Sequence, residues 1–200
     1  MERLDFFAEL FLEHIVISFI AIIIATFLGI ALGIYISDKN KIKTVVLNIV
    51  SFLYTIPAIS FLGLLIPFLG IGNKTAIFTL TIYALLPIVN STYVGITNIE
   101  KSLLEASLGM GCTKRQILYK IKLPLAFPYI LAGIRNMAVM TISLTGIASF
   151  VGAGGLGVAI YRGITTNNKS ITFIGSILIA LLAITVDHGL GCFEKRIKGR

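Results

Sequence analysis

Residues 14–37 read HIVISFIAIIIATFLGIALGIYIS and contain no Asp, Glu, Lys or Arg. About 20 apolar residues are enough for a helix to cross the hydrocarbon core of a bilayer, so this run predicts a membrane-spanning helix. Ala25, Gly29 and Gly33 recur every four residues along it. Small residues at this spacing let two helix backbones approach closely, so we expect this face to pack against another span.

Four further stretches have the same apolar character. Two contain no charged residue and two are interrupted once; they are 44–73, 75–99, 123–161 with Arg135, and 170–193 with Asp187. The stretch 44–73 is too short for two crossings and a turn, so it counts as one span. The sequence therefore predicts an all-α, polytopic membrane protein with five spanning helices. The composition agrees, because 56% of the residues are hydrophobic and only 13% are charged.

The basic residues gather on one side of the predicted membrane. If the chain crosses five times, the segments 38–43, 98–122 and 194–200 share a side, and they carry 12 of the 17 Lys and Arg residues. Short loops rich in Lys and Arg stay in the cytoplasm, so the N-terminus is predicted outside and the C-terminus inside. No internal repeat or linker divides the chain. We expect a single transmembrane domain over residues 1–200 with a cytoplasmic loop at 100–124.

Prolines and tyrosines mark the predicted spans. Each proline removes a helical hydrogen bond and should bend its helix, and bends are tolerated where protein or a water-filled cavity covers them. This favours a transport pathway over a simple anchor, and the prolines are Pro57, Pro67 and Pro87. Four tyrosines either line a cation pathway or anchor the spans at the membrane interface; they are Tyr54, Tyr83, Tyr93 and Tyr161.

The cytoplasmic loop reads EKSLLEASLGMGCTKRQILYKIKLP from Glu100 to Pro124. It predicts two short helices joined at Gly111, with Pro124 ending the second helix and starting the fourth span. Two S/T-x-x-E/Q patterns predict capping boxes, Ser102 with Glu105 and Thr113 with Gln116. Four apolar side chains have no lipid to face if the loop stands off the membrane, and they predict a docking surface: Leu103, Leu104, Leu108 and Met110.

The loop resembles the EAA loop of binding-protein-dependent ABC importers. The pattern consists of Glu105-Ala106-Ser107, then Gly111, and then Ile121-x-Leu123-Pro124, and it departs from the family only in Ser107, where alanine is usual. In that family the loop forms a coupling helix, here including Leu108, that seats in a groove of a cytoplasmic ATPase. Glu105 therefore has two competing roles, as the capping residue of its own helix or as a contact to the ATPase.

The resemblance extends over roughly residues 10 to 197. The runs TIPAISFLGLLIPFLGIGNKTA, LLPIVNSTYVGI, LAGIRN and ASFVGAGGLG are similar to permeases of the Opu type, which import glycine betaine, carnitine and choline. The resemblance implies a permease subunit in a bacterial cell membrane that forms the pathway for such osmoprotectants. Methionine-type importers have a similar five-helix permease and a similar loop, so a methionine-type or other small polar solute importer is the alternative.

The partners follow from what the chain lacks. Five helices are too few to enclose a pathway with two gates, so a second permease copy or a close paralogue is needed. Because no GxxxxGK[ST] occurs in the sequence, ATP and Mg would be bound by separate ATPase subunits, and this chain is expected to bind no cofactor and to catalyse nothing. A separate extracellular or periplasmic binding protein is expected to capture the substrate.

Two charges lie inside the predicted spans, and such residues usually face the protein interior. We expect Arg135 to reach inward and pair with Asp187. The glycine-rich run Gly152-Ala-Gly154-Gly155-Leu-Gly157 lacks the Lys-Ser or Lys-Thr of a phosphate-binding loop, and it is expected to be a tightly packed outer loop that helps to close the pathway.

Other classes of protein fit less well. The basic residues are scattered in short gaps between apolar runs, whereas a nucleic-acid-binding protein needs a basic patch on a folded surface. His14, His188, Cys112 and Cys192 form no cluster, so neither a metal site nor a membrane-embedded enzyme is indicated. A channel or secondary transporter would explain the broken helices but not the loop pattern.

Overall fold

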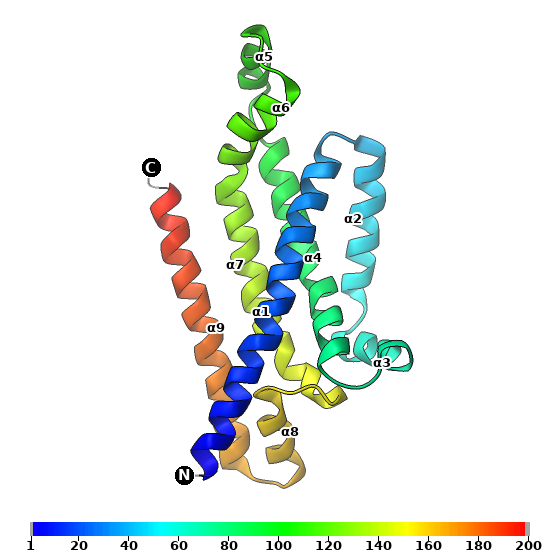
Figure 1. The fold of residues 1–200 in the computed structure, drawn as a ribbon, viewed down its shortest axis with the longest axis vertical. Coiled ribbons are helices and arrows are strands. Elements are labelled where there is room, and N and C mark those ends of the chain that lie inside the picture. Colours follow the sequence, from blue (N-terminus) through cyan, green and yellow to red (C-terminus); the bar gives the residue numbers. More distant parts are fainter. Residues whose placement is uncertain (1, 199–200) are drawn as a thin grey trace.

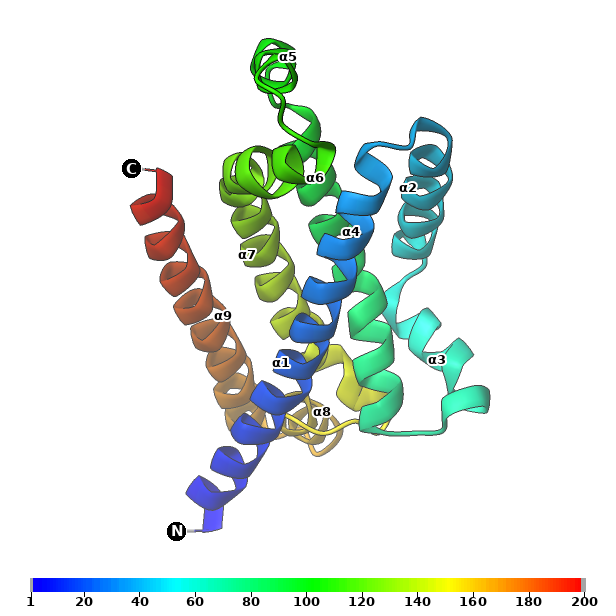
Figure 2. The ribbon, with the colours of Figure 1, turned by 45° about the horizontal axis from the view of Figure 1, so that its top comes forward.

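The computed structural model describes residues 2–198, and these residues are helical almost throughout (Figure 1). Three long helices form the centre: α1 (Glu2–Ser37), α4 (Asn73–Thr97) and α7 (Leu123–Ala148). Helix α1 packs against α4, α4 packs against α7, and α9 (Lys169–Lys198) lies along α7. Figure 2 shows the same bundle turned by 45°, with α9 diverging from the centre toward its C-terminal end.

The shorter helices lie at the sides and the two ends of the bundle. Helices α2 (Asn40–Thr55) and α3 (Ala58–Leu69) pack against α4. Helices α5 (Lys101–Gly109) and α6 (Lys114–Ile117) stand at one end, which we call the loop end. Helix α8 (Gly157–Thr165) lies at the other end, called the opposite end, where it packs against α9 near the start of α1 (Figure 1).

The stretch 44–73 was expected to form one span, but it divides into α2 and α3, which meet at 98°. Pro57 causes the break, because it excludes Ile56 from the helical region and leaves that residue extended, with a ψ of 129°. Four helices in the described residues are long and apolar enough to cross a membrane, and the bent pair makes a fifth if it counts as one span. The predicted bend at Pro57 is confirmed, whereas Pro67 and Pro87 lie inside the helices α3 and α4.

Close packing between α1 and α4 forms much of the core. A methyl group on Gly29 would collide with Ile88, and one on Gly33 would lie 2.6 Å from the Cβ atom of Thr92. Ala25, on the same stripe, is fully buried. The predicted close approach along this face is confirmed, and it holds the two central helices in register.

Two of the long helices turn apolar faces outward. The exposed side chains of α1 between Val16 and Ala31 are all apolar. Between Phe173 and Thr185, α9 exposes apolar side chains together with two hydroxyl residues that donate to their own helix. These faces suit a lipid surround, because no water is available there to satisfy a polar group. We call them the lipid face.

Candidate functional site

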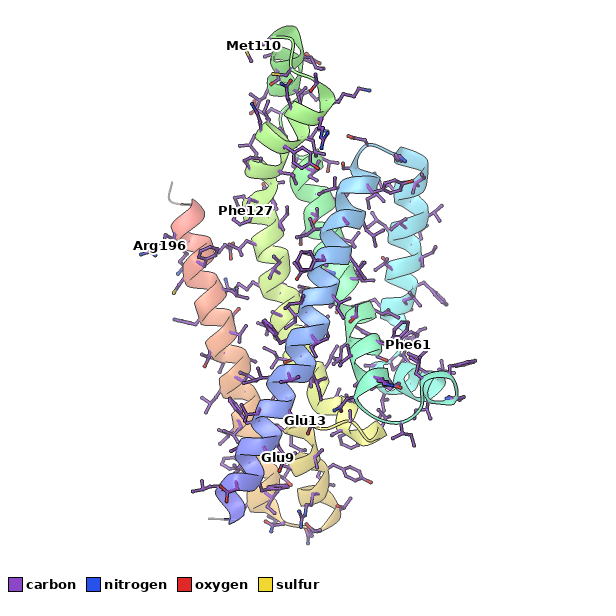
Figure 3. All side chains as sticks on the ribbon, viewed as in Figure 1. Glu9, Glu13, Phe61, Met110, Phe127 and Arg196 are labelled. Atoms are coloured by element: carbon purple, nitrogen blue, oxygen red, sulfur yellow. The ribbon has the colours of Figure 1, made fainter. Side chains whose placement is uncertain are left out.

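The loop end places a short helix, α5, farthest from the bundle. Figure 3 shows Met110 at its tip, and this side chain is 76% exposed. Leu103 and Leu108 are also exposed, whereas Ser107 is buried and its hydroxyl donates to the Leu103 carbonyl at 2.6 Å. The small Ser107 therefore faces inward, and Leu104, which was also expected to be exposed, is half-buried. Leu103, Leu108 and Met110 point outward with nothing in the described chain covering them.

The turn after α5 depends on Gly111. Its φ is +84°, in the left-handed region that favours glycine, and its amide donates to the Leu108 carbonyl at 2.9 Å. The chain reverses here and starts α6, whose N-cap is Thr113. Thr113 and Gln116 exchange backbone and side-chain hydrogen bonds, so the predicted capping box is confirmed.

The other predicted capping box is wrong. Helix α5 begins at Lys101, so Ser102 already lies inside it, and the Ser102 hydroxyl donates to the Glu100 carboxylate at 3.3 Å instead. The N-cap is Glu100, and it makes no side-chain capping bond. Glu105 is exposed and does not cap its helix. Of the two roles that competed for Glu105, the local one is removed.

Helix α6 does not end at Pro124, contrary to the sequence prediction. It continues through a π-helical turn, Leu118–Lys122, into α7, and Pro124 lies in the first turn of α7. Two features let the chain pass Pro124 without a break. The π turn before it has i→i+5 hydrogen bonds, which differ from the α-helical pattern, and a proline in the first turn of a helix needs no amide hydrogen. Ile121 and Leu123 are half-buried in this junction. Lys122 pairs with Asp38 at 3.0 Å, which ties the junction to the end of α1.

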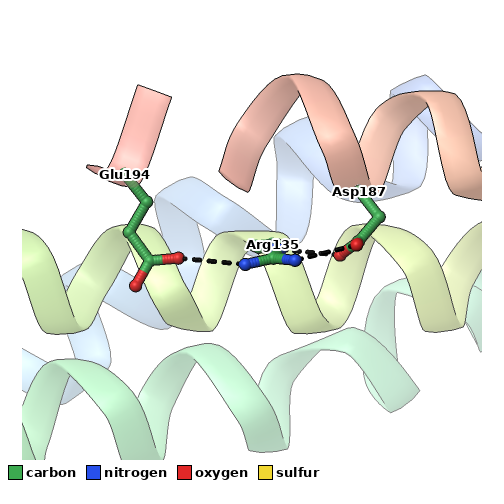
Figure 4. Close-up of polar contacts among 3 residues, drawn as sticks. All are labelled: Arg135, Asp187 and Glu194. Atoms are coloured by element: carbon green, nitrogen blue, oxygen red, sulfur yellow. Dashed lines mark hydrogen bonds and ion pairs between the residues drawn. The ribbon is translucent and has the colours of Figure 1, made fainter. Parts of the chain in front are cut away.

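Between α7 and α9, the partly exposed Arg135 of α7 meets two carboxylates of α9 (Figure 4). Its Nε and Nη2 atoms donate to the two oxygens of Asp187 at 2.6 and 2.8 Å, and its Nη1 atom lies 3.4 Å from Glu194. The sequence pointed to Asp187 but not to Glu194. A signal was present, because residues seven apart lie two turns apart on one helix face.

At the opposite end, side chains from α1 and α4 form hydrogen bonds with the backbone of the glycine-rich loop. Glu13 of α1 accepts hydrogen bonds from the Asn73 amide and from the Gly155 backbone, both at 3.0 Å. The Asn73 carbonyl oxygen accepts from the Gly154 backbone at 2.8 Å. A side chain at Gly154 would collide with the Glu13 carboxylate. We call Glu13, Asn73 and the loop Gly152–Gly157 the polar clasp.

The polar clasp was only half visible in the sequence. The glycines were singled out, whereas Glu13 and Asn73 sit just at the edges of apolar runs and carry no local motif. Helix α8, which follows the loop, was also missed, because it begins inside the stretch 123–161 that was counted as a single span. His14, which follows Glu13 in α1, is buried, and its Nε2 atom donates to the Ile142 carbonyl at 3.0 Å. A pocket of about 760 Å³ opens beside Glu13 and Asn73.

A third group of residues lies where α2 breaks. The Tyr83 hydroxyl donates to the Ile56 carbonyl, which the break leaves without a helical partner. The Tyr83 ring is then 5.9 Å from the rings of both Tyr54 and Phe61. Of the other two tyrosines, Tyr93 lies beneath Lys43 and Tyr161 lies against Phe150, so the four do not form one row.

Comparison with known proteins gives these features a family context. The family described as "Binding-protein-dependent transport system inner membrane component" matches residues 25–199. The carnitine transport permease protein OpuCD of Listeria monocytogenes is 42% identical over 190 residues, which cover 94% of this chain and 85% of that protein. The glycine betaine/carnitine/choline transport system permease protein OpuCD of Bacillus subtilis is 40% identical over 188 residues, which cover 94% and 82%.

The fold has solved counterparts. A chain from inward-facing conformations of the MetNI methionine ABC transporter superposes with a TM-score of 0.84 at 26% identity. The match covers 92% of this chain and 93% of that one. The all-helical arrangement is therefore that of ABC transporter permeases, and the sequence identity is higher to the two OpuCD proteins than to the MetNI chain.

Proposed function

The chain belongs to the family of binding-protein-dependent transport system inner membrane components, and from this premise we propose that it imports quaternary-amine osmoprotectants. It is the permease subunit of an ATP-driven importer. Glycine betaine, carnitine and choline are the expected substrates, and each carries a trimethylammonium group. The relatives at 42% and 40% identity carry the proposal, because each aligns over more than nine-tenths of this chain.

The loop end is assigned to the cytoplasm. In the bundle, the turn between α1 and α2, the loop helices and the C-terminal end of α9 share this end (Figure 1). These segments carry most of the Lys and Arg residues, and positively charged loops stay inside. The N-terminus and the polar clasp are then outside. This orientation gives five crossings when the bent pair α2 and α3 counts as one.

Helix α5 is assigned as the docking helix for a separate ATPase subunit. Its exposed Leu103, Leu108 and Met110 suit an apolar groove, which is how an amphipathic helix is usually recognised. Glu105 and Ala106 are exposed beside them and complete the contact surface. ATP and Mg are bound by that partner, and this chain supplies no ATPase site of its own.

The polar clasp is assigned as an outer gate element. Glu13 and Asn73 hold the loop Gly152–Gly157 across the end of the bundle through backbone hydrogen bonds. A binding protein that docks on this side would bring its substrate to the same place. The pathway itself is completed by a second permease copy or a paralogue, because the spans of one chain cannot surround it.

Reconstitution tests the proposal. The chain is placed in proteoliposomes with its ATPase and binding protein, and ATP-dependent uptake of labelled glycine betaine, carnitine, choline and methionine is measured. We expect uptake of at least one trimethylammonium solute and none without ATP. Uptake of methionine alone would show that the substrate is methionine and not a trimethylammonium solute. Uptake that continues without ATP would contradict the assignment as an ATP-driven importer.

A further inference from the structure

The side of the bundle formed by α2, α4 and α7 differs from the lipid face. Asn90 of α4 and Asn136 of α7 expose carboxamides at positions inside their spans, and neither makes a side-chain hydrogen bond within the described residues. A carboxamide in lipid has no partner for its donors and acceptor, so such residues usually face protein or a water-filled cavity. This side therefore faces the pathway or the second permease.

A pocket of about 440 Å³ opens on this side, between α2 and α4. Its lining includes Ser51 and Tyr54 from α2, and Pro87 and Asn90 from α4. The volume falls within the range of roughly 300–1,000 Å³ that small-molecule sites occupy. No charged side chain lines it, so the pocket offers a ring face, a hydroxyl and a carboxamide.

The broken helix fixes the orientation of the aromatic ring. Because the Tyr83 hydroxyl is held by the Ile56 carbonyl, the Tyr83 ring stands behind Tyr54 and supports it. The Tyr54 hydroxyl donates to the sulfur atom of Met140 on α7 at 3.2 Å, which fixes its other end. Tyr54 is nevertheless 41% exposed, so its ring remains accessible from the pocket side.

These groups match the chemistry of a quaternary amine. A trimethylammonium group donates no strong hydrogen bond, and aromatic faces attract it through their quadrupole. The hydroxyl of Ser51 and the carboxamide of Asn90 can donate to the carboxylate of a betaine or accept from the hydroxyl of choline. A primary ammonium would need acceptors for three N–H groups, and no carboxylate lines the pocket.

We propose that the pocket of Ser51, Tyr54, Pro87 and Asn90 is a substrate-contact site of the pathway. The Tyr54 ring receives the trimethylammonium group, and Ser51 and Asn90 receive the polar end of the substrate. The inference rests on the proposed function, because it assumes that quaternary amines pass through this chain.

Transport by the reconstituted complex gives the first test. Tyr54→Leu is expected to lower the maximal ATP-driven uptake of glycine betaine and choline about five- to tenfold, in line with the loss of one cation–π contact. Tyr54→Phe, which keeps the ring, is expected to stay within twofold of the wild type. Phe52→Leu is the matched control, because Phe52 is exposed on the same helix but lies about 200° around it.

The outcomes separate the two levels of the argument. If the wild type takes up no trimethylammonium solute, the proposed function fails and the site fails with it. If the wild type transports and Tyr54→Leu is as active, only the site is overturned. An equal loss in Tyr54→Phe and Tyr54→Leu would assign the effect to the hydroxyl contact with Met140, and it would also overturn the site.

Chemical labelling gives a second test that does not depend on transport. Ser51→Cys is introduced after Cys112→Ser and Cys192→Ser remove the native thiols, and the complex is treated with a methanethiosulfonate reagent that carries a trimethylammonium group. We expect labelling that excess glycine betaine or choline slows several-fold, and slow, unprotected labelling of Phe52→Cys. Equal labelling with and without substrate would overturn the site. So would an oxidative cross-link that joins the Ser51→Cys residues of two copies, because it would place the pocket inside the permease interface.

Discussion

The loop end and the opposite end of the bundle differ in how far the rest of the chain contacts the loop that lies there. At the opposite end, Glu13 and Asn73 satisfy the backbone of the glycine-rich loop from within the chain. At the loop end, α5 leaves Leu103, Leu108 and Met110 exposed. A loop that is tied internally is suited to close, whereas a helix with uncovered apolar side chains is suited to bind a partner. The difference supports the proposal that the loop end binds the ATPase.

The largest expected effect comes from the turn at the loop end. Gly111→Val places a β-branched residue at a φ of +84°, which costs about 1–2 kcal/mol and misdirects α5. We expect ATP-driven uptake to fall roughly tenfold, in proportion to that cost. Gly109→Val is the control, because both glycines have open space around them and only Gly111 has a positive φ. Equal losses in the two variants would contradict a backbone origin.

The next effect concerns the ion pair between α7 and α9, which belongs to neither end. Arg135→Met leaves Asp187 and Glu194 as neighbouring carboxylates without their cation, so we expect a lower melting temperature of the solubilised protein. Asp187→Asn should lower it less, because Glu194 remains to pair with the arginine. The pairing account is wrong if Asp187→Asn is the more damaging change.

At the opposite end, Glu13→Ala removes the two carboxylate acceptors that Glu13 supplies to the polar clasp and leaves the one from Asn73. A loop released in this way is expected to let the transporter cycle without its binding protein, so basal ATP hydrolysis should rise several-fold, by analogy with couplings of about 1–3 kcal/mol. Glu9→Ala is the control, since Glu9 lies one turn earlier on the same helix and is exposed (Figure 3). Unchanged basal ATP hydrolysis in Glu13→Ala would show that the polar clasp has no role in gating.

The smallest effect compares the two predicted caps of the loop helices. Thr113→Ala loses a capping bond and should lower the local opening free energy of α6 by about 1 kcal/mol, whereas Ser102→Ala should leave α5 unchanged. Amide hydrogen exchange at Gln116 and in the first turn of α5 measures both. Faster exchange at the start of α5 in Ser102→Ala would mean that Ser102 caps this helix, contrary to the structure.

Local patterns in the sequence predicted much of the loop end. Gly111 and the cap of Thr113 were predictable because their conformations depend on neighbouring residues. Ser102 misled because it lies two residues past the N-cap, already inside the helix, and Pro124 misled because a π turn precedes it. Short motifs state which bonds are available but not where a helix begins.

Contacts between distant segments were harder to predict. The pairing of Arg135 with Asp187 was expected because charges inside spans have few partners to choose from. Glu13, Asn73 and Gly155 are brought together from three separate segments, and only Gly155 belongs to a run that the sequence singled out. A bend at Pro57 was predicted, but not a turn of 98° that divides the expected span into two helices, because apolar content does not report direction.

Hydrogen–deuterium exchange tests most directly whether the loop end is the docking surface for the ATPase. The permease is measured in lipid nanodiscs with and without its ATPase subunit. We predict that the bound subunit slows exchange over α5, residues 101–109, and leaves the loop 152–157 unchanged. Unchanged exchange over α5 in a complex that has demonstrably formed, or protection confined to the opposite end, would contradict the assignment.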